Sequence, residues 1–246
     1  MSKSILLAFP TFAAAAALST PTAGDFVREL RGAKTALLRG VAAEGGALSE
    51  DALALMDGLG RVNPSAPNPA ADVDLWANHY DVRWRLPLPT PPGWDGWDAA
   101  TEAAVVRLRR DEAEFEAGVL LAGDPELRGR LRFAGPLSVP AGSRTALEWR
   151  PTELELEFDD GSDAAAAACN ALGGILPDDV FKAQLAFDDG TGSAITKMSA
   201  SWQRAKSELV VGIELTYLDQ DMILCMLPAL GDARVVLERR RDSESE

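Results

Sequence analysis

Two carboxylates stand one residue apart near the C-terminal end of the chain, in the stretch ELVVGIELTYLDQDMILCM from Glu208 to Met226. An apolar, strand-like run leads up to Asp219 and Asp221, and a second apolar run follows them. Residues i and i+2 of a strand share a face, so the two side chains are placed to act together. Four roles suit such a pair: a metal site, a catalytic acid and base, a turn between strands, or the mouth of a ligand cavity.

Catalysis by this pair would need a partner that orients a water or a substrate, and the sequence offers few. The chain has one histidine, His79, and no G-x-S-x-G motif, so a catalytic triad has little to build on. Zinc needs three or four ligands, and the two cysteines, Cys169 and Cys225, lie in unrelated contexts. We predict two buried free thiols, no catalytic residues, no metal and no cofactor. An enzyme with a lipophilic substrate is kept as an alternative.

A ligand site is the remaining chemical role for the pair Asp219 and Asp221, which we call the acidic step. Two aromatic residues can contribute to such a site. Tyr217 precedes Asp219 by two residues, and Trp84 falls on an inward-facing position of the strand-like stretch 79–88. We predict that Trp84, Tyr217, Asp219 and Asp221 bind a ligand, with a carboxylate at its polar head and its tail in an apolar interior. The alternatives are a core position for Trp84 and a turn in which an aspartate accepts backbone N–H bonds.

Two helices begin the framework that must position these residues. From Asp25 to Val62, apolar residues recur at spacings of three and four, with charged residues between them. A Gly-Gly pair interrupts the pattern, and Ser49 followed by two acids predicts the N-cap of a second helix. The proline-rich stretch 63–69 ends that helix. The sequence therefore predicts a helical hairpin over 25–70.

Beyond residue 70 the apolar period becomes that of strands. In TELELEF (152–158), leucines and phenylalanine alternate with glutamates, which only a strand places on opposite faces. Further strands are predicted over 79–88, 127–139, 181–187, 210–215, 222–227 and 233–239. Residues 99–116 suit either a helix or a pair of strands that place Val105, Val106 and Leu108 against a core, and we favour a helix at their start. The alanine run 164–168 suggests one short helical turn. The spacing predicts a mainly β (α+β) fold: a closed antiparallel barrel of about eight strands capped by the helical hairpin.

The chain ends and the charge restrict the partners. The apolar stretch from Ile5 to Leu18 is short for a bilayer span but typical of a targeting sequence, so 1–24 is predicted to be a targeting remnant or an apolar N-terminal segment. Residues 71–240 then form the barrel, and 241–246 an acidic tail. The formal net charge of −14 argues against a nucleic-acid partner, and any lipid contact would have to be apolar or locally basic.

The segment TYLDQDMILCM…ARVVLERR resembles the C-terminal signature of the plastid lipid-associated protein (PAP, or fibrillin) family. The matching positions are Thr216, Tyr217, Leu218, Asp219 and Asp221, with Gln220 where the family has an acid. Residues 33–69 are similar to the family's helical opening, and 82–90 to its first barrel strand. The chain departs from the pattern at Ile223, where the family has arginine, and at Pro87, where an aromatic residue is usual. The two ends together cover about half of the chain.

This resemblance implies a lipocalin-like barrel in the plastid (chloroplast), peripheral on thylakoid or plastoglobule membranes. It implies a non-enzymatic protein that binds a hydrophobic small molecule, such as a prenylquinone, a carotenoid or a membrane lipid. The alternative is a structural or accessory subunit of a photosynthetic complex in the thylakoid membrane, with a barrel filled by its own side chains.

Overall fold

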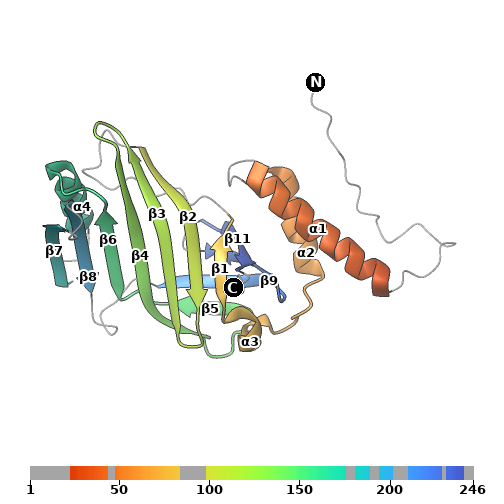
Figure 1. The fold of residues 1–246 in the computed structure, drawn as a ribbon. Coiled ribbons are helices and arrows are strands. Elements are labelled where there is room, and N and C mark those ends of the chain that lie inside the picture. Colours follow the sequence, from red (N-terminus) through yellow and green to blue (C-terminus); the bar gives the residue numbers. More distant parts are fainter. Residues whose placement is uncertain are drawn as a thin grey trace, which may run out of the picture.

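The computed structural model of the chain describes residues 23–43, 48–83, 98–175, 181–188, 194–201, 210–228 and 231–240. As predicted, the fold is mainly β, and its centre is a closed antiparallel barrel of the lipocalin-like kind (Figure 1). The helices are α1 (Ala23–Ala43), α2 (Glu50–Arg61), the 3-10 helix η1 (Pro69–Ala71), α3 (Val73–Trp76) and α4 (Asp163–Ile175). The strands are β1 (His79–Val82), β2 (Asp98–Leu108), β3 (Glu112–Ala122), β4 (Leu127–Ser138), β5 (Ala146–Trp149), β6 (Glu153–Phe158), β7 (Phe181–Asp188), β8 (Ala194–Ser201), β9 (Val211–Leu218), β10 (Met222–Leu227) and β11 (Ala233–Arg239).

Eight of these strands make the barrel, in the order β1–β2–β3–β4–β5–β9–β10–β11, and β11 pairs with β1 to close it. Neighbours in the barrel are antiparallel and, apart from the step from β5 to β9 and the closing pair β11–β1, consecutive in the chain. Between β5 and β9 the chain leaves the barrel. It forms β6, α4, β7 and β8, which extend the sheet on the far side of β4 from the helical hairpin (Figure 1).

Strand β4 belongs to both the barrel and the extension. Its residues 129–134 pair with β6, and its last two residues pair with β5. Gly135 lies at the changeover, where a Cβ atom would be 2.2 Å from the carbonyl oxygen of Arg150. On either side, the Arg150 N–H donates to the Pro136 carbonyl at 2.9 Å and the Thr152 N–H to the Ala134 carbonyl at 2.8 Å. The chain between β5 and β6 therefore stays bonded to β4 at a point that only glycine fits.

The barrel interior is packed with apolar side chains from every barrel strand and from the short helices. Trp76 of α3 is buried there, and its Nε1–H donates to the Ala70 carbonyl at 3.0 Å. The Tyr80 hydroxyl donates to the Leu75 carbonyl at 2.9 Å, so both polar aromatic groups are satisfied without water. The buried residues of this core are Ala70, Trp76, Tyr80, Leu108, Ala113, Leu137, Leu147, Leu215, Leu218, Ile223, Cys225, Val235 and Leu237.

Helix α4 covers the inner face of the extension with small residues. Ala165, Ala168 and Cys169 are fully buried against β6 and β8. Cys169 and Cys225 are both free and buried, which confirms the prediction of two buried thiols. Burial raises the pKa of Cys169 to about 11 and that of Cys225 to about 12, so both thiols stay protonated near neutral pH.

The opposite face of this sheet carries charges whose sign alternates from strand to strand. Arg107 of β2 lies 3.2 Å from Glu114 of β3, which lies 2.6 Å from Arg132 of β4. Arg132 and Lys197 of β8 flank Glu155 of β6 at 3.7 and 3.3 Å. Burial raises the pKa of Glu114, but the hydrogen bonds from Arg132 and Arg107 outweigh it, so this pKa lies below its ordinary value. These charged side chains on the outer face of the sheet are therefore paired with one another across neighbouring strands.

Several local predictions meet a clear outcome. The bounds of β10 and β11 and the Ser49 N-cap are confirmed, with the Ser49 Oγ accepting from the Ala52 N–H at 3.3 Å. The helix expected at the start of 99–116 is wrong, because that stretch forms β2 and pairs with β1 and β3. The alanine run 164–168 is not a single turn but part of the 13-residue helix α4. Trp84, the N-terminal apolar segment as far as residue 22 and the tail 241–246 lie outside the described residues.

Candidate functional site

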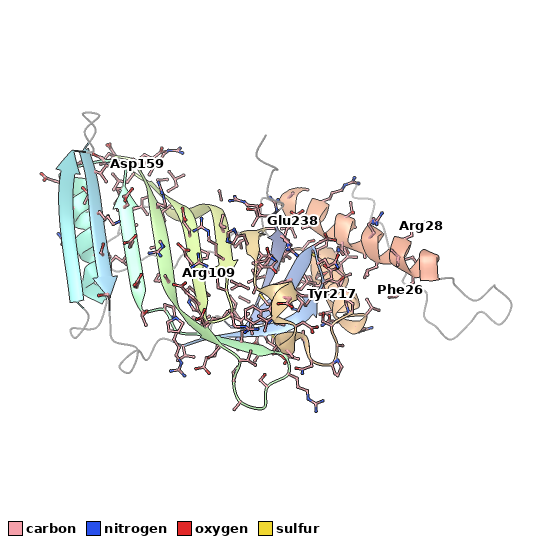
Figure 2. All side chains as sticks on the ribbon, turned by 60° about the horizontal axis from the view of Figure 1, so that its bottom comes forward. Phe26, Arg28, Arg109, Asp159, Tyr217 and Glu238 are labelled. Atoms are coloured by element: carbon pink, nitrogen blue, oxygen red, sulfur yellow. The ribbon has the colours of Figure 1, made fainter. Side chains whose placement is uncertain are left out.

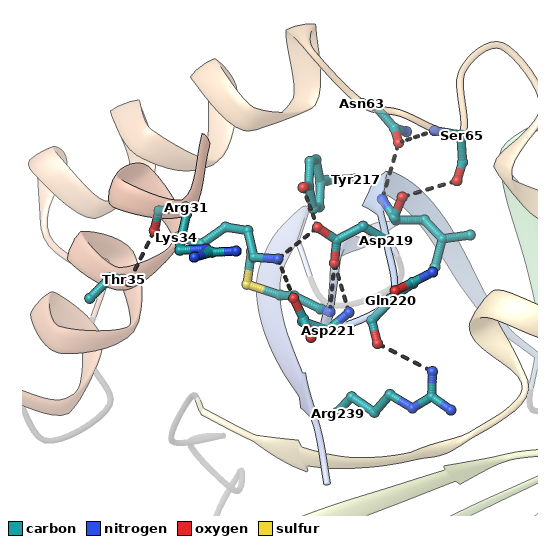
Figure 3. Close-up of polar contacts among 12 residues, drawn as sticks. Arg31, Lys34, Thr35, Asn63, Ser65, Tyr217, Asp219, Gln220, Asp221 and Arg239 are labelled. Atoms are coloured by element: carbon teal, nitrogen blue, oxygen red, sulfur yellow. Dashed lines mark hydrogen bonds and ion pairs between the residues drawn. The ribbon is translucent and has the colours of Figure 1, made fainter. Parts of the chain in front are cut away.

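The acidic step forms the tight turn between β9 and β10 (Figure 3). The Asp219 N–H donates to the Met222 carbonyl at 3.1 Å, which closes the turn. Asp219 Oδ1 accepts the N–H of Asp221 at 2.9 Å and that of Met222 at 3.0 Å. The Asp219 carboxylate therefore caps backbone donors, the turn role left open by the sequence.

A β-bulge just before this turn decides which way Tyr217 points. Along β10, Leu224 pairs with Tyr217 but Cys225 pairs with Leu215, so Thr216 is an extra residue on β9. The Thr216 hydroxyl donates to the Leu224 carbonyl at 3.0 Å. Without the bulge, Leu215 and Tyr217 would share a face. With it, Leu215 lies in the barrel core and Tyr217 is buried outside the wall, in the cluster beneath α1 and α2.

Lys34 of α1 joins the helical hairpin to the acidic turn. Asp219 Oδ2 accepts the Tyr217 hydroxyl at 2.5 Å and Lys34 Nζ at 2.7 Å, and Lys34 Nζ also donates to Asp221 Oδ2 at 2.8 Å. The Lys34 side chain is only 15% exposed. Burial lowers the pKa of Lys34, but its hydrogen bonds and charge interactions with Asp219 and Asp221 outweigh this, and the net pKa is raised. The ammonium group thus remains charged against two carboxylates.

The loop after α2 makes a second connection, to the end of strand β9 that precedes this turn. Asn63 Nδ2 donates to the Thr216 carbonyl at 3.3 Å, and Asn63 Oδ1 accepts the Leu218 N–H at 3.2 Å. The Ser65 hydroxyl donates to the Leu218 carbonyl at 3.0 Å. Side chains of the loop thus bond the backbone of β9 on both sides of Tyr217. The helical hairpin is held to the barrel at α1 and again after α2.

The hydrogen bonds that Asp219 already accepts limit the chemistry of the site. Its two oxygens accept two backbone N–H groups, a hydroxyl and an ammonium, which leaves no lone pair directed at a substrate. The more accessible carboxylate is Asp221, whose side chain is 57% exposed. Among the described residues, no group of three or more His, Cys, Asp or Glu side chains is placed to hold a metal ion. The arrangement suits binding and positioning better than proton transfer.

A groove of about 650 Å³ runs beside this network, between α1 and the β10–β11 side of the barrel. Apolar side chains form much of its lining, and Lys34 and Asp221 contribute a polar wall. The lining residues are Val27, Leu30, Arg31, Lys34, Thr35, Leu38, Asp221, Met222 and Glu238. A second groove of about 560 Å³ lies between α2, the loop 63–69 and strands β9 to β11.

The structure brings together Tyr217, Asp219 and Asp221 of the four predicted ligand residues, while Trp84 lies outside the described part. The ligand role of these residues stays a prediction. Sequence reasoning missed Lys34, although one signal pointed to it. Lys34 stands on the apolar stripe of its helix, where a charged group needs a buried partner. Asn63 and Ser65, missed as well, sit in the proline-rich loop and carry no comparable signal.

No protein-family model matches the chain, and no curated protein matches its sequence. The resemblance to the fibrillin family therefore stays a prediction that rests on the motifs given above. Across the described helices, none is both long and apolar enough to cross a membrane.

The two tyrosines give this arrangement a measurable pH dependence. Burial raises the pKa of both Tyr80 and Tyr217, and the hydrogen bond to Asp219 raises that of Tyr217 further. The folded state therefore keeps phenol protons that the unfolded state loses above pH about 10, so stability is unaffected below that pH and falls above it. We expect tyrosinate absorbance to appear only as circular dichroism reports unfolding, with half the amplitude in Tyr217→Phe. Tyrosinate that forms near pH 10 in a folded protein would contradict this burial.

Proposed function

We propose that the protein is a non-enzymatic plastid lipid-associated protein that binds a hydrophobic small molecule at thylakoid or plastoglobule membranes. The ligand class is a prenylquinone, a carotenoid or a membrane lipid. The ligand lies in the groove between α1 and the β10–β11 side of the barrel, next to the Lys34–Asp219–Asp221 network. The family, the plastid location and the ligand class rest on the sequence resemblance at the two ends of the chain.

The groove is the observation that carries this proposal. Its volume of about 650 Å³ is within the range of small-molecule sites, which combine an apolar lining with a few polar groups. Leu30, Leu38 and Met222 supply apolar surface, and removing such surface from water stabilises binding by roughly 25 cal/mol per Å². Lys34 and Asp221 lie at one wall, where they would orient a polar head group.

The packing of the barrel is a second reason to place the ligand in the groove. Thirteen buried residues fill the barrel interior, whereas the groove lies outside it, along the helical hairpin. The predicted residues Tyr217, Asp219 and Asp221 would then serve the ligand from outside the barrel wall. Asp221 contacts it, and Asp219, which itself accepts the Tyr217 hydroxyl, holds Lys34 in place.

Ligand content and a matched pair of variants test this function. We expect lipophilic molecules in solvent extracts of the protein purified from its native membrane. Decyl-plastoquinone should bind the purified chain, and Leu30→Ser should weaken that binding about tenfold, because Leu30 lines the groove. Leu55→Ser is the control, since Leu55 packs against the same hydrophobic cluster but does not line the groove. Equal loss in both variants, or extracts free of lipid in every preparation, would contradict the proposal.

A second candidate is a structural or accessory subunit of a photosynthetic membrane complex. The filled barrel favours it, because small barrels packed by their own side chains need no ligand for stability. This role predicts co-migration with a membrane complex on a native gel that survives lipid extraction. A free pool that carries lipid would instead favour the first candidate.

A further inference from the structure

Strand β7 has a single partner in the part of the chain that the structure describes. Every other described strand pairs with at least two neighbours, whereas β7 pairs with β8 alone. That pairing is continuous, because all eight residues of β7 have a partner on β8, with no bulge and no proline in the strand. The strand lies at the end of the molecule opposite the first turns of α1 (Figures 1 and 2). Proteins usually protect such an edge with proline, a bulge or a covering element, since another strand can pair along it.

The two faces of β7 differ in polarity. Met198 and Ala200 of β8 are buried beneath α4, and the register places the even-numbered positions of β7 opposite this row. Lys182 lies on that side, since its Nζ donates to the Gly173 carbonyl of α4 at 2.6 Å. The odd-numbered positions fall on the outer face of the sheet, and all four are apolar residues: Phe181, Ala183, Leu185 and Phe187. The outer face, which is charged on β3, β4 and β6, therefore ends in an apolar row at its free edge.

The sequence of β7 is complementary to itself in a two-fold arrangement. A two-fold axis perpendicular to the sheet makes the contact reciprocal, so each residue lies opposite a residue on the same face of the second copy. Only the registers centred on Gln184 and on Leu185 then pair as many as seven residues of the strand. In the register centred on Leu185, Lys182 lies opposite the second copy's Asp188, and the reciprocal pair forms at the other end. Centring on Gln184 would leave Lys182 opposite an alanine, so charge complementarity favours the register on Leu185.

We propose that the protein forms a two-fold dimer in which β7 of each copy pairs antiparallel with β7 of the other, centred on Leu185. The extensions of the two copies become one continuous sheet, with both α4 helices on the same face of it. Because both copies use the same edge, the contact closes at two copies and leaves no free β7 edge. The net charge of −14 opposes association, but β7 carries one lysine and one aspartate, so the paired strands themselves have no net charge. This inference does not depend on the proposed ligand.

Light scattering coupled to size-exclusion chromatography of the full chain tests the dimer. We expect a mass of about twice the 26.2 kDa of one chain. Leu185→Lys and Leu185→Glu should each raise the dimer dissociation constant about a hundredfold, because each places two like charges opposite one another at the centre of the contact. An equimolar mixture of the two variants should form a dimer again, since a lysine then lies opposite a glutamate. Val139→Lys is the matched control, because Val139 is 41% exposed after the end of β4, and this variant should dimerise like the wild type.

Each possible outcome decides for or against this contact. A wild-type chain that stays monomeric at every soluble concentration, or that forms assemblies larger than a dimer, would overturn the inference. So would a dimer that survives both Leu185 variants, or a mixture of the two that fails to restore it. Hydrogen exchange of the wild type needs no variant: the β7 amides should exchange more slowly as concentration rises through the dissociation constant, and unchanged exchange would mean that β7 stays unpaired. Circular dichroism checks that each variant is folded.

The same variants keep this inference separate from the ligand proposal. The groove lies along the helical hairpin and has no lining residue from β7. Leu185→Lys should therefore bind decyl-plastoquinone like the wild type while it loses the dimer.

Discussion

Asp219→Ala is expected to lower the free energy of unfolding by about 3 kcal/mol, because one carboxylate serves four donors. The variant would leave the Tyr217 hydroxyl without its partner and Lys34 with only the more exposed Asp221. It would also remove the cap from the N–H groups of Asp221 and Met222 in the β9–β10 turn. The loss exceeds that of an ordinary surface ion pair, because the Asp219 side chain is only 16% exposed.

Urea unfolding of three further variants separates the parts of this effect. Asp219→Asn keeps an oxygen for the backbone donors but removes the charge, so it should cost about half as much as Asp219→Ala. Lys34→Met should cost about 1 kcal/mol, because Asp219 retains its other three donors. In the double variant Lys34→Met/Asp219→Ala, the measured loss should be smaller than the sum of the two single losses, because each single change already removes the same Lys34–Asp219 contact. Simple additivity would show that the two residues do not interact, contrary to the 2.7 Å contact.

Gly135→Ala is expected to destabilise the protein by about 3 kcal/mol for a steric reason. The added methyl group would lie 2.2 Å from the Arg150 carbonyl oxygen and 2.8 Å from Pro151 Cα. Both are backbone atoms, so relief requires β4 and the β5–β6 connection to separate. We expect faster hydrogen exchange at the amides of Arg150 and Thr152, which are bonded to β4 across this point.

A second glycine provides the control for this substitution. Gly212 also lies in a barrel strand, β9, but a Cβ atom there meets nothing within 4 Å. Gly212→Ala should change the free energy of unfolding by no more than about 0.5 kcal/mol. A similar cost for both variants would mean that the loss reflects glycine content in strands and not the close approach at Gly135.

The strands that sequence reasoning found are those whose pattern is local. Alternation in 153–158 separates buried Leu154 and Leu156 from the glutamates between them, as the structure has it. A helix was preferred at the start of β2 because its alanines and glutamate have good helix propensity, and pairing with β1 and β3 overrides that preference. Strand β5 has only four residues, too few for a periodic signal. Helix α4 continues past the alanine run because its small side chains pack closely on β6 and β8.

In the candidate site, too, the local sequence pattern predicts some contacts, and contacts between residues far apart in the chain are not predictable from it. Spacing alone places Asp219 and Asp221 together, and they meet at a tight turn. Their cation, Lys34, lies 185 residues from Asp219 along the chain, a contact that no local pattern reports. The bulge at Thr216 has a stronger consequence, because it reverses the side of the sheet on which Tyr217 lies. Simple alternation from Leu215 would place that tyrosine in the barrel interior.

The excursion between β5 and β9 has a consequence for how this architecture can vary. The chain leaves the barrel after one strand and returns as that strand's immediate neighbour, so the ring keeps a simple up-and-down connectivity whatever happens in between. Extra chain inserted there, or trimmed from it, leaves the order of the ring unchanged. Removal of the segment between β5 and β9 would expose the edge of β4 that bonds β6. A related protein without this segment would need another way to cover that edge.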